Sequence, residues 1–270
     1  MFDGEVVVAG HICLDVIPTF AATGGGAVRP GTLVRVGPAQ FAPGGAVANV
    51  GMALSRLGCL PRLVGKVGAD QFGATLLALL RAQDAQLAAG MRITAGETTS
   101  YSVVINPPGI DRTFLHCPGA NDTFGAAEMA TLDWAGVRLL HFGYPPLMAR
   151  IAADDGAELA TLLGEARAHG VTTVLDMAWP DPDSALGQID WGTLLRRCLP
   201  HVDCFMPSVE EVRFMLDGAG NTESWTVAEL DALAERCLAM GAAIVAIKLG
   251  DQGLYLRTTA DATRLRQAGA

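Results

Sequence analysis

Lysine is nearly absent from this chain: only Lys66 and Lys248 occur among its 270 residues, and the other cationic side chains are arginines. Lysine and arginine together number 19 against 28 aspartates and glutamates, which gives a formal net charge of −9. An acidic chain without a run of basic residues is a poor candidate for binding nucleic acid or an anionic membrane surface. We therefore expect neither of these as a partner.

Cysteine motifs and long apolar runs are also missing. The six cysteines form no Cys-x-x-Cys pair and no Cys/His cluster with zinc spacing, so we interpret them as small core residues in a reducing compartment. The first residues are acidic, unlike the basic start of a signal peptide. The longest strongly apolar stretch, 237–247, is far shorter than the ~20 residues of a membrane span. These features predict a cytoplasmic protein.

Apolar residues make up 50% of the chain and charged residues 17%. This composition excludes intrinsic disorder. Its length suits one large α/β domain or two small ones. Buried-strand patterns alternate with helical spacing, which is typical of a parallel α/β sheet. Strands are expected at 5–10, 62–67, 137–142, 172–176, 202–206, 243–249 and 254–256, and helices at 47–57, 70–80, 152–169, 191–198, 209–216 and 226–240.

Two stretches break this alternation. Residues 98–119 contain two strand patterns around an Asn-Pro-Pro-Gly turn, which predicts a β-hairpin. Residues 12–43 are interrupted by glycine and proline, with a further strand expected at 33–36. We interpret both stretches as a small β appendage beside the α/β body. The last residues, up to Ala270, form a polar run for which no packing partner is expected.

Candidate ligand-binding residues lie near the first strand and the first helix. Asp15 closes the first strand region, where its carboxylate could accept two hydrogen bonds from a sugar diol; alternatively it is a loop cap or a solvated carboxylate. Gly44 and Gly45 precede a helix and would let a ligand approach the backbone, with Asn49 offering a donor and an acceptor. The alternative is an ordinary tight turn followed by a surface asparagine.

Further candidates lie at later strand ends. Asp176 ends a strand at the same expected edge. Ser208 and Glu211 stand where a helix begins, a place that favours phosphate or hydrated metal, although Ser-x-x-Glu is also a capping box. Their functional and structural interpretations remain open.

The last candidates flank a turn between two strands. Lys248, Gly250 and Gly253 could let a nucleotide approach the main chain, or could form an ordinary hairpin. The five histidines have no paired spacing, and we interpret each of them as structural. No Walker loop, Gly-x-Ser-x-Gly elbow or His-Glu-x-x-His motif is present, and no glycine fingerprint follows the first strand, as a nicotinamide-dependent oxidoreductase requires.

Taken in order, these positions resemble the ribokinase-like, phosphofructokinase B-type carbohydrate kinases. The stretches 44–58 and 65–73 look like the first signature of that family, and the agreement extends over many spaced positions. The hairpin that leads to Asn121 resembles its lid strand and the following segment. The stretch 206–211 is similar to its Asn-x-x-Glu motif, and 248–253 to its nucleotide-side turn.

The resemblance implies a three-layer α/β/α sandwich with a mainly parallel central sheet and a small β-sheet lid from strands in about 12–43 and 98–119, within one domain over 1–270. It implies ATP-dependent phosphoryl transfer to a sugar or nucleoside hydroxyl, with Mg²⁺ and in some members a monovalent cation. The lid would exclude water and is compatible with a homodimer. Substrate contacts are then expected from Asp15, Gly44, Gly45, Asn49, Asn121 and Asp176, nucleotide contacts from Ser208, Lys248, Gly250 and Gly253, and a metal contact from Glu211.

The sequence also departs from the family pattern. Ser208 replaces the usual asparagine, and the Asp-x-Asn-x-Arg pattern expected around Asp176 lacks its asparagine and arginine. The family's second signature, a Gly-Ala-Gly-Asp loop with the catalytic aspartate, is expected beyond Ala270. Gly-Ala-Asn-Asp at 119–122 imitates it at the wrong place, so we assign no catalytic base. A catalytically inactive sugar- or nucleotide-binding relative is therefore the alternative.

Overall fold

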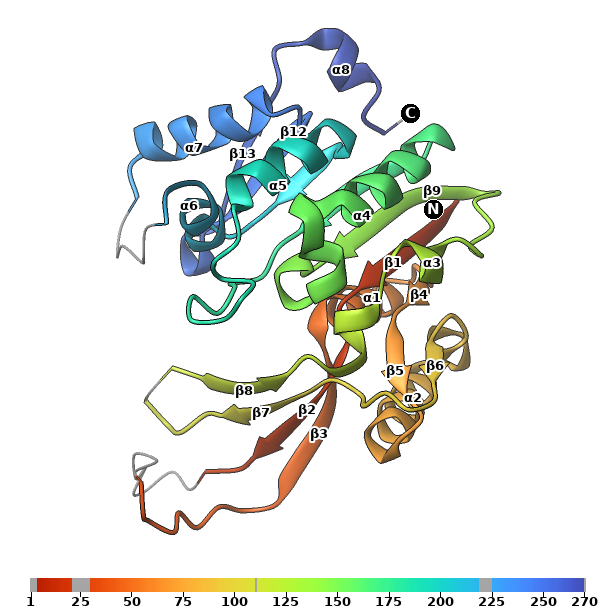
Figure 1. Ribbon diagram of the computed structural model, residues 1–270, viewed down its shortest axis with the longest axis vertical. Coiled ribbons are helices and arrows are strands. Elements are labelled where there is room, and N and C mark those ends of the chain that lie inside the picture. The colour runs from red at the N-terminus through yellow and green to blue at the C-terminus, as the bar shows by residue number, and fades with distance from the viewer. Residues whose placement is uncertain (1–3, 21–29, 110, 219–224, 270) are drawn as a thin grey trace.

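A seven-stranded sheet forms the centre of the computed structural model, which describes residues 4–20, 30–109, 111–218 and 225–269. The strand order is β13–β12–β11–β10–β9–β1–β4, and every neighbouring pair is parallel except β12 and β13 (Figure 1). The mainly parallel sheet expected from the alternating pattern is therefore confirmed. The strands are β1 (Glu5–Gly10), β4 (Arg62–Val64), β9 (Val137–Gly143), β10 (Thr172–Asp176), β11 (Cys204–Met206), β12 (Ile244–Lys248) and β13 (Leu254–Thr258).

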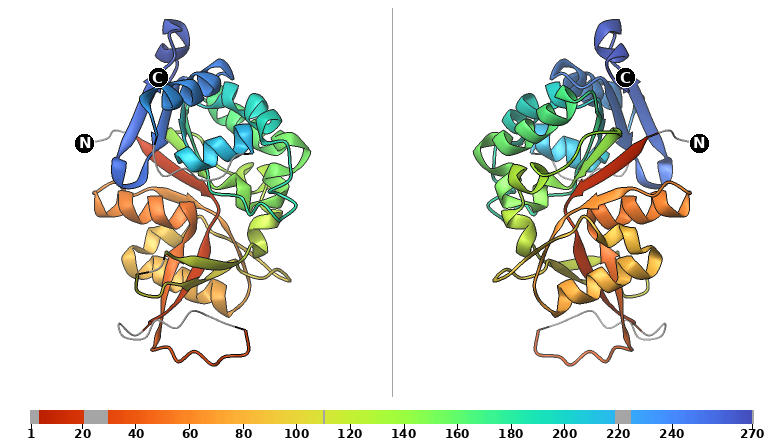
Figure 2. Two further views of the ribbon diagram at one scale, coloured as in Figure 1. Left: turned by 90° about the vertical axis from the view of Figure 1, so that its left-hand side faces the viewer. Right: turned by 90° about the vertical axis from the view of Figure 1, so that its right-hand side faces the viewer.

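Helices cover both faces of this sheet, and β1 shows why. Its side chains alternate between faces, so that Val7 and Ala9 join one buried core while Val6 and Val8 join the other. The first core packs under α4 (Ala149–Ala168), α5 (Trp191–Cys198), α6 (Val209–Asp217) and α7 (Val227–Ala239), and the second under α1 (Gly45–Arg56) and α2 (Gln71–Gln83). Figure 2 shows α4 and α5 on one side of the sheet and α1 on the other.

Side-chain caps fix where several helices begin. The Asp70 carboxylate accepts a hydrogen bond from the backbone N–H of Gly73 at 2.8 Å, as expected for the start of α2. Thr226 and Glu229 form the predicted capping box at the start of α7. Within the described ranges, no helix combines the length and the apolar character that crossing a membrane requires.

A second sheet projects from the end of the body where β1 finishes (Figure 1). It has the order β3–β2–β7–β8, with β2 parallel to β7 and the other pairs antiparallel. These strands come from the two stretches expected to form the β appendage. Their bounds are β2 (Cys13–Pro18), β3 (Ala39–Gly44), β7 (Tyr101–Ile105) and β8 (Thr113–Cys117).

Two strand predictions were wrong. Residues 33–36 form no strand. Leu33 is 97% exposed, so the alternation of apolar residues in this run does not correspond to a buried face. The run at 62–67 is two strands in different sheets, since the chain leaves the main sheet at Gly65 and β5 (Lys66–Gly68) pairs with β6 (Arg92–Thr94). The glycines expected to form a turn at 24–26 lie outside the described residues.

We predicted no packing partner for the C-terminal run, and this prediction was wrong. It forms α8 (Ala262–Arg266), from which Arg264 Nη1 donates to the Asp203 carboxylate at 2.7 Å. Asp203 is only 2% exposed. Arg264 also donates to the carbonyl oxygens of Val202 and Gly241. The sequence pattern did not predict this contact, because hydrophobic periodicity reveals buried apolar residues and the buried partner here is the Asp203 carboxylate.

Candidate functional site

Several strands of the main sheet end at the same level. Gly10, which ends β1, lies opposite Gly143 of β9, and Gly143 lies opposite Asp176 of β10. Further along the edge, Ser208 forms an isolated bridge with Lys248 of β12. In open α/β sheets, ligands bind beyond the carboxyl ends of the strands. The second sheet leaves the body at this same edge, so the two sheets frame one candidate site.

Asp15 and Gly44 lie against each other on neighbouring strands of the second sheet. A Cβ atom placed on Gly44 would lie 2.4 Å from Asp15 Oδ2, so any larger residue would force this carboxylate to move. Gly45 has a φ of +81°, and a Cβ there would lie 2.6 Å from His11 Nδ1. The paired glycines therefore serve a close approach between β2, the end of β1 and the start of α1.

The start of α1 lacks a side-chain cap, which leaves the N–H groups of Gly45 and Ala46 without a capping side chain, whereas the Val47 N–H donates to the His11 carbonyl at 3.1 Å. Asn49 follows in the first turns of this helix and is exposed. Asp15 is half-buried, and it accepts a hydrogen bond from Cys13 Sγ at 3.4 Å. Burial raises the pKa of Asp15, while the thiol and the Arg112 charge act in the opposite direction. The group thus combines the Asp15 carboxylate, a helix start without a side-chain cap and the exposed Asn49 side chain.

A pair of histidines joins the body to the second sheet. His11 Nε2 and His116 Nε2 are 3.3 Å apart, and His116 Nδ1 lies 2.9 Å from Ser102 Oγ. Burial, with a smaller contribution from His116, lowers the pKa of His11 to about 3, so one neutral ring donates to the other. Sequence spacing could not reveal this pair, because its members are 105 residues apart.

On the other side of the site, Lys248 lies between two carboxylates. Its ammonium is 2.5 Å from Asp176 Oδ1 and 4.0 Å from Glu211 Oε2. Burial alone would lower the pKa of Lys248, but the two carboxylates outweigh it and raise that pKa. Asp176, Glu211 and Lys248 thus form one charge cluster. The sequence had suggested separate substrate, metal and nucleotide contacts for them.

Ser208 and Glu211 form a capping box at the start of α6. Ser208 N–H donates to Glu211 Oε2 at 2.6 Å, and Glu211 N–H donates to Ser208 Oγ at 3.2 Å. The structural interpretation of this pair is therefore confirmed, and the ligand contacts expected from it stay predictions. Burial raises the pKa of Glu211 to about 7, although the Lys248 charge opposes this.

We expect Glu211→Gln to flatten the pH dependence of stability. In the wild type the folded-state pKa of about 7 lies above the ordinary 4.5, so this carboxyl destabilises the fold progressively as pH rises from about 4.5 to above 7. The difference amounts to at most about 3 kcal/mol. Urea unfolding of both proteins at pH 5 and pH 8 measures it, and an unchanged pH slope in the variant would contradict this assignment.

The turn after β12 leaves its backbone accessible. Gly250 and Gly253 have φ values of +60° and +97°, and no atom lies within 4 Å of a Cβ placed on either. Leu249 N–H donates to the Gly253 carbonyl, which closes the turn. The hairpin interpretation is confirmed by the antiparallel pairing of β12 and β13. The open main chain remains available to a nucleotide, whereas the Lys248 ammonium is held by Asp176.

Asn121 lies apart from these groups and is 0% exposed. Its Oδ1 accepts from Ile12 N–H at 3.2 Å, and its Nδ2 donates to the carbonyls of Ile12 and Pro118. Both polar atoms are therefore committed to backbone where β1 leads into β2. We consequently omit Asn121 from the ligand contacts proposed below.

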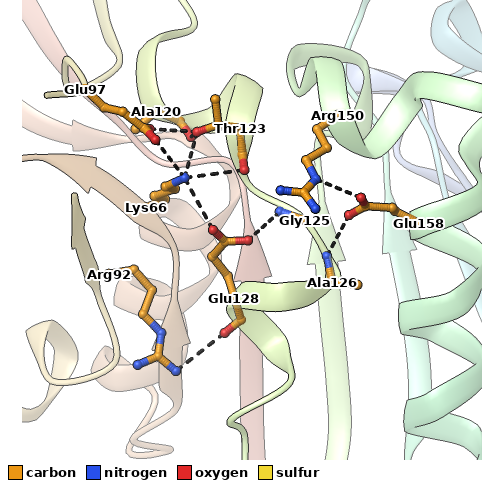
Figure 3. Close-up of polar contacts among 10 residues, drawn as sticks. All are labelled: Lys66, Arg92, Glu97, Ala120, Thr123, Gly125, Ala126, Glu128, Arg150 and Glu158. Atoms are coloured by element: carbon orange, nitrogen blue, oxygen red, sulfur yellow. Dashed lines mark hydrogen bonds and ion pairs between the residues drawn. The ribbon is translucent and has the colours of Figure 1, made fainter. Parts of the chain in front are cut away.

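A buried lysine network holds the segment that carries Asn121. Lys66 is 6% exposed, and its ammonium contacts Glu97 at 3.0 Å, Glu128 at 3.3 Å and Thr123 Oγ1 at 2.7 Å (Figure 3). Thr123 ends the short helix η2 (Gly119–Thr123), which contains Asn121. Each of the two lysines of this lysine-poor chain thus neutralises a pair of carboxylates.

We expect Asn121→Ala to destabilise the protein by about 2–4 kcal/mol, because it leaves the N–H and the carbonyl of Ile12 without their partner inside the fold. Chemical denaturation measures the loss. Asn106→Ala, at an exposed position in the hairpin between β7 and β8, is the matched control and should change stability by less than about 0.5 kcal/mol. Equal stability of the two variants would refute the anchoring role.

Comparison with known proteins places the chain in a family. A family model described as pfkB family carbohydrate kinase matches residues 3–268, so the chain belongs to the pfkB family of carbohydrate kinases. Fructokinase-2 of Solanum lycopersicum is 30% identical over 191 residues, which cover 69% of this chain and 55% of that protein. The chain thus spans about half the length of this relative. An uncharacterized sugar kinase of Archaeoglobus fulgidus is 25% identical over 206 residues, 76% of this chain and 73% of that protein.

Solved structures confirm the fold class. A ribokinase from Giardia lamblia superposes with a TM-score of 0.74 at 18% identity, covering 96% of this chain and 73% of that one. Arabidopsis thaliana ribokinase complexed with ribose and ATP gives a TM-score of 0.71 at 18% identity, covering 96% and 76%. The ribokinase-like α/β/α architecture implied by the sequence motifs is therefore correct.

Proposed function

We propose that this protein is a kinase that transfers the γ-phosphate of ATP to a hydroxyl of a sugar or nucleoside. The observation that carries the proposal is the Asp15 carboxylate, which lies against the side-chain-free Gly44 beside the uncapped start of α1. Membership of a carbohydrate kinase family and the similarity to a fructokinase support it.

The substrate contacts proposed are those suited to a polyol. Asp15 accepts hydrogen bonds from two neighbouring hydroxyls, and the exposed Asn49 both donates and accepts. The N–H groups of Gly45 and Ala46 donate to a hydroxyl or to an oxygen that gains negative charge. Asp176 completes this set from the end of β10, with its charge balanced by Lys248.

The nucleotide is proposed to lie along the open Gly250–Gly253 turn, near Ser208 and Lys248. In the described part of the chain, no three His, Cys, Asp or Glu residues cluster as a metal cage. Magnesium usually keeps several waters and binds through one or two carboxylates plus substrate phosphates, so Glu211 fits a water-mediated contact. When bound, the ion supplies neutralisation of phosphate charge.

No residue of this chain is proposed as the base that accepts the hydroxyl proton. The family's Gly-Ala-Gly-Asp loop has no counterpart at residues 119–122. There, Asp122 Oδ1 accepts from Ala149 N–H at 3.0 Å, at the start of α4, which supports a structural role for this aspartate. The residues named above bind and orient the substrate and balance charge.

The second sheet is proposed to act as a lid that excludes water from the site. Three of its apolar side chains, Phe41, Phe114 and Leu115, are about half exposed, which supports a homodimer formed through this sheet. The six cysteines are all free, in keeping with a cytoplasmic location.

A coupled assay of ADP release, with ATP and D-fructose, D-ribose or adenosine as acceptor, tests the proposal. Calorimetry with the same acceptors runs in parallel. Turnover with any acceptor supports a kinase. Saturable acceptor binding without ADP release favours the alternative, a catalytically inactive sugar-binding relative. If the protein shows no turnover and binds neither an acceptor nor ATP, both the kinase proposal and its alternative are wrong.

A further inference from the structure

Tyr144 adopts a backbone conformation that bulky residues avoid. Its φ of +65° and ψ of +47° lie in the left-handed region, immediately after β9. Side chains with a Cβ pay a steric penalty there, and such positions are concentrated at functional sites. Glycine would adopt this conformation without strain, so the presence of an aromatic ring calls for a physical reason.

The surrounding chain fixes this conformation. Tyr144 N–H donates to the carbonyl of Asp176 at 3.1 Å, and the Tyr144 carbonyl accepts from Leu147 N–H at 3.0 Å. Pro145 follows directly and begins η3 (Pro145–Leu147). Two backbone hydrogen bonds and a rigid proline therefore hold the backbone of Tyr144. The hydrogen bond to Asp176 fixes the position of this residue relative to the end of β10.

The ring does not serve the hydrophobic cores. Tyr144 is half-buried, and it is absent both from the buried residues of the two cores and from the partly buried residues packed against them. Its neighbours are polar instead. The exposed Asn49 side chain acts on the Tyr144 hydroxyl and lowers its pKa against the effect of burial, and the Tyr144 ring centroid lies 6.1 Å from that of His11.

Tyr144 also lies between the two groups of the candidate site. Asn49 and His11 belong to the side with Asp15 and the paired glycines. Asp176, Lys248 and Glu211 form the other group, and their charges act on the Tyr144 hydroxyl; burial together with Asp176 raises the pKa of Tyr144, so the hydroxyl stays protonated. The residue therefore stands where the polyol and the charge cluster meet.

We propose that Tyr144 is a specificity-determining residue: its ring carries the C–H face of a sugar while its hydroxyl orients the Asn49 amide toward the sugar hydroxyls. This inference rests on the proposed function, because it names how the same site recognises its acceptor. A flat apolar ring beside a carboxylate and an amide matches a sugar ring, which has C–H groups on its faces and hydroxyls at its edge. The backbone strain is the consequence of holding the ring there.

The test uses three variants of the full chain, Tyr144→Gly, Tyr144→Phe and Tyr255→Phe. Calorimetry with D-fructose, D-ribose and adenosine gives the Kd of each acceptor that the wild type binds, and thermal unfolding gives Tm. We expect Tyr144→Gly to raise Kd at least 10-fold with Tm unchanged or higher, because strain is relieved. Tyr144→Phe keeps the ring and should raise Kd about 3-fold. Tyr255→Phe, whose hydroxyl contacts Asp231 on the surface, should leave Kd unchanged.

The outcomes separate this inference from the proposed function. If the wild type binds an acceptor and Tyr144→Gly binds it equally well, the specificity role is wrong and the proposed function stands. A fall in Tm with an unchanged Kd would likewise show that Tyr144 is only structural. If the wild type neither binds nor turns over any of the acceptors and does not bind ATP, the proposed function and this inference both fail.

Discussion

Asp15→Ala is expected to weaken acceptor binding by roughly 100-fold or more. A carboxylate that accepts two hydroxyl hydrogen bonds contributes about 3 kcal/mol or more, since hydrogen bonds to charged groups contribute about 1.5–3 kcal/mol each. The protein itself should lose no stability, because burial raises the pKa of Asp15 and, within the described residues, the side-chain hydrogen bond that it accepts comes from the Cys13 thiol. Calorimetry with the acceptor and thermal unfolding measure the two effects separately.

Two further variants make this expectation specific. Asp15→Asn keeps the shape and one acceptor oxygen, so its Kd should fall between those of the wild type and Asp15→Ala. Asp111→Ala removes an exposed carboxylate from the hairpin of the same sheet and should leave Kd unchanged. Equal losses for Asp15→Ala and Asp111→Ala would indicate a general charge effect and contradict a direct contact.

Lys248→Met is expected to cause a large loss of stability, about 2–4 kcal/mol at pH 8. It leaves the carboxylates of Asp176 and Glu211 without their counter-charge at the buried edge of the sheet. The loss stays below the range for a fully buried pair because the lysine side chain is 38% exposed. At pH 5 it should be smaller, since Glu211 is protonated below its pKa of about 7.

Urea unfolding at the two pH values measures this prediction. The double variant Lys248→Met/Asp176→Asn provides the control, because removing one unpaired carboxylate charge should recover much of the stability lost at pH 8. A Lys248→Met protein as stable as the wild type at both pH values would show that the cluster is not an energetic unit.

Local rules predicted much of the fold. The Thr226–Glu229 capping box and the Asp70 cap mark true helix starts because they depend on residues within three positions of each other. The pattern at 62–67 predicts one strand, since no local signal shows that the chain changes sheets at Gly65. The C-terminal helix was missed because its anchor, Arg264 on Asp203, joins residues 61 positions apart.

In the candidate site, too, local patterns were predictable from the sequence and contacts between distant residues were not. Gly44, Gly45 and Asn49 were recognisable because they belong to one contiguous pattern. The contact between Lys248 and Asp176 spans 72 residues, and that between His11 and His116 spans 105, so spacing could not show either. Tyr144 carries no sequence motif at all, and only its left-handed backbone and its polar neighbours single it out.

The central claim is that Asp15, Gly44 and the start of α1 bind a polyol, and one titration tests it most directly. D-fructose, D-ribose and adenosine are each titrated by calorimetry into the wild-type protein and into Asp15→Ala at pH 7.5. The account predicts saturable 1:1 binding of at least one acceptor by the wild type, with that binding lost or weakened roughly 100-fold in the variant. Wild-type affinity in Asp15→Ala, or no saturable binding of any acceptor by the wild type, would contradict it.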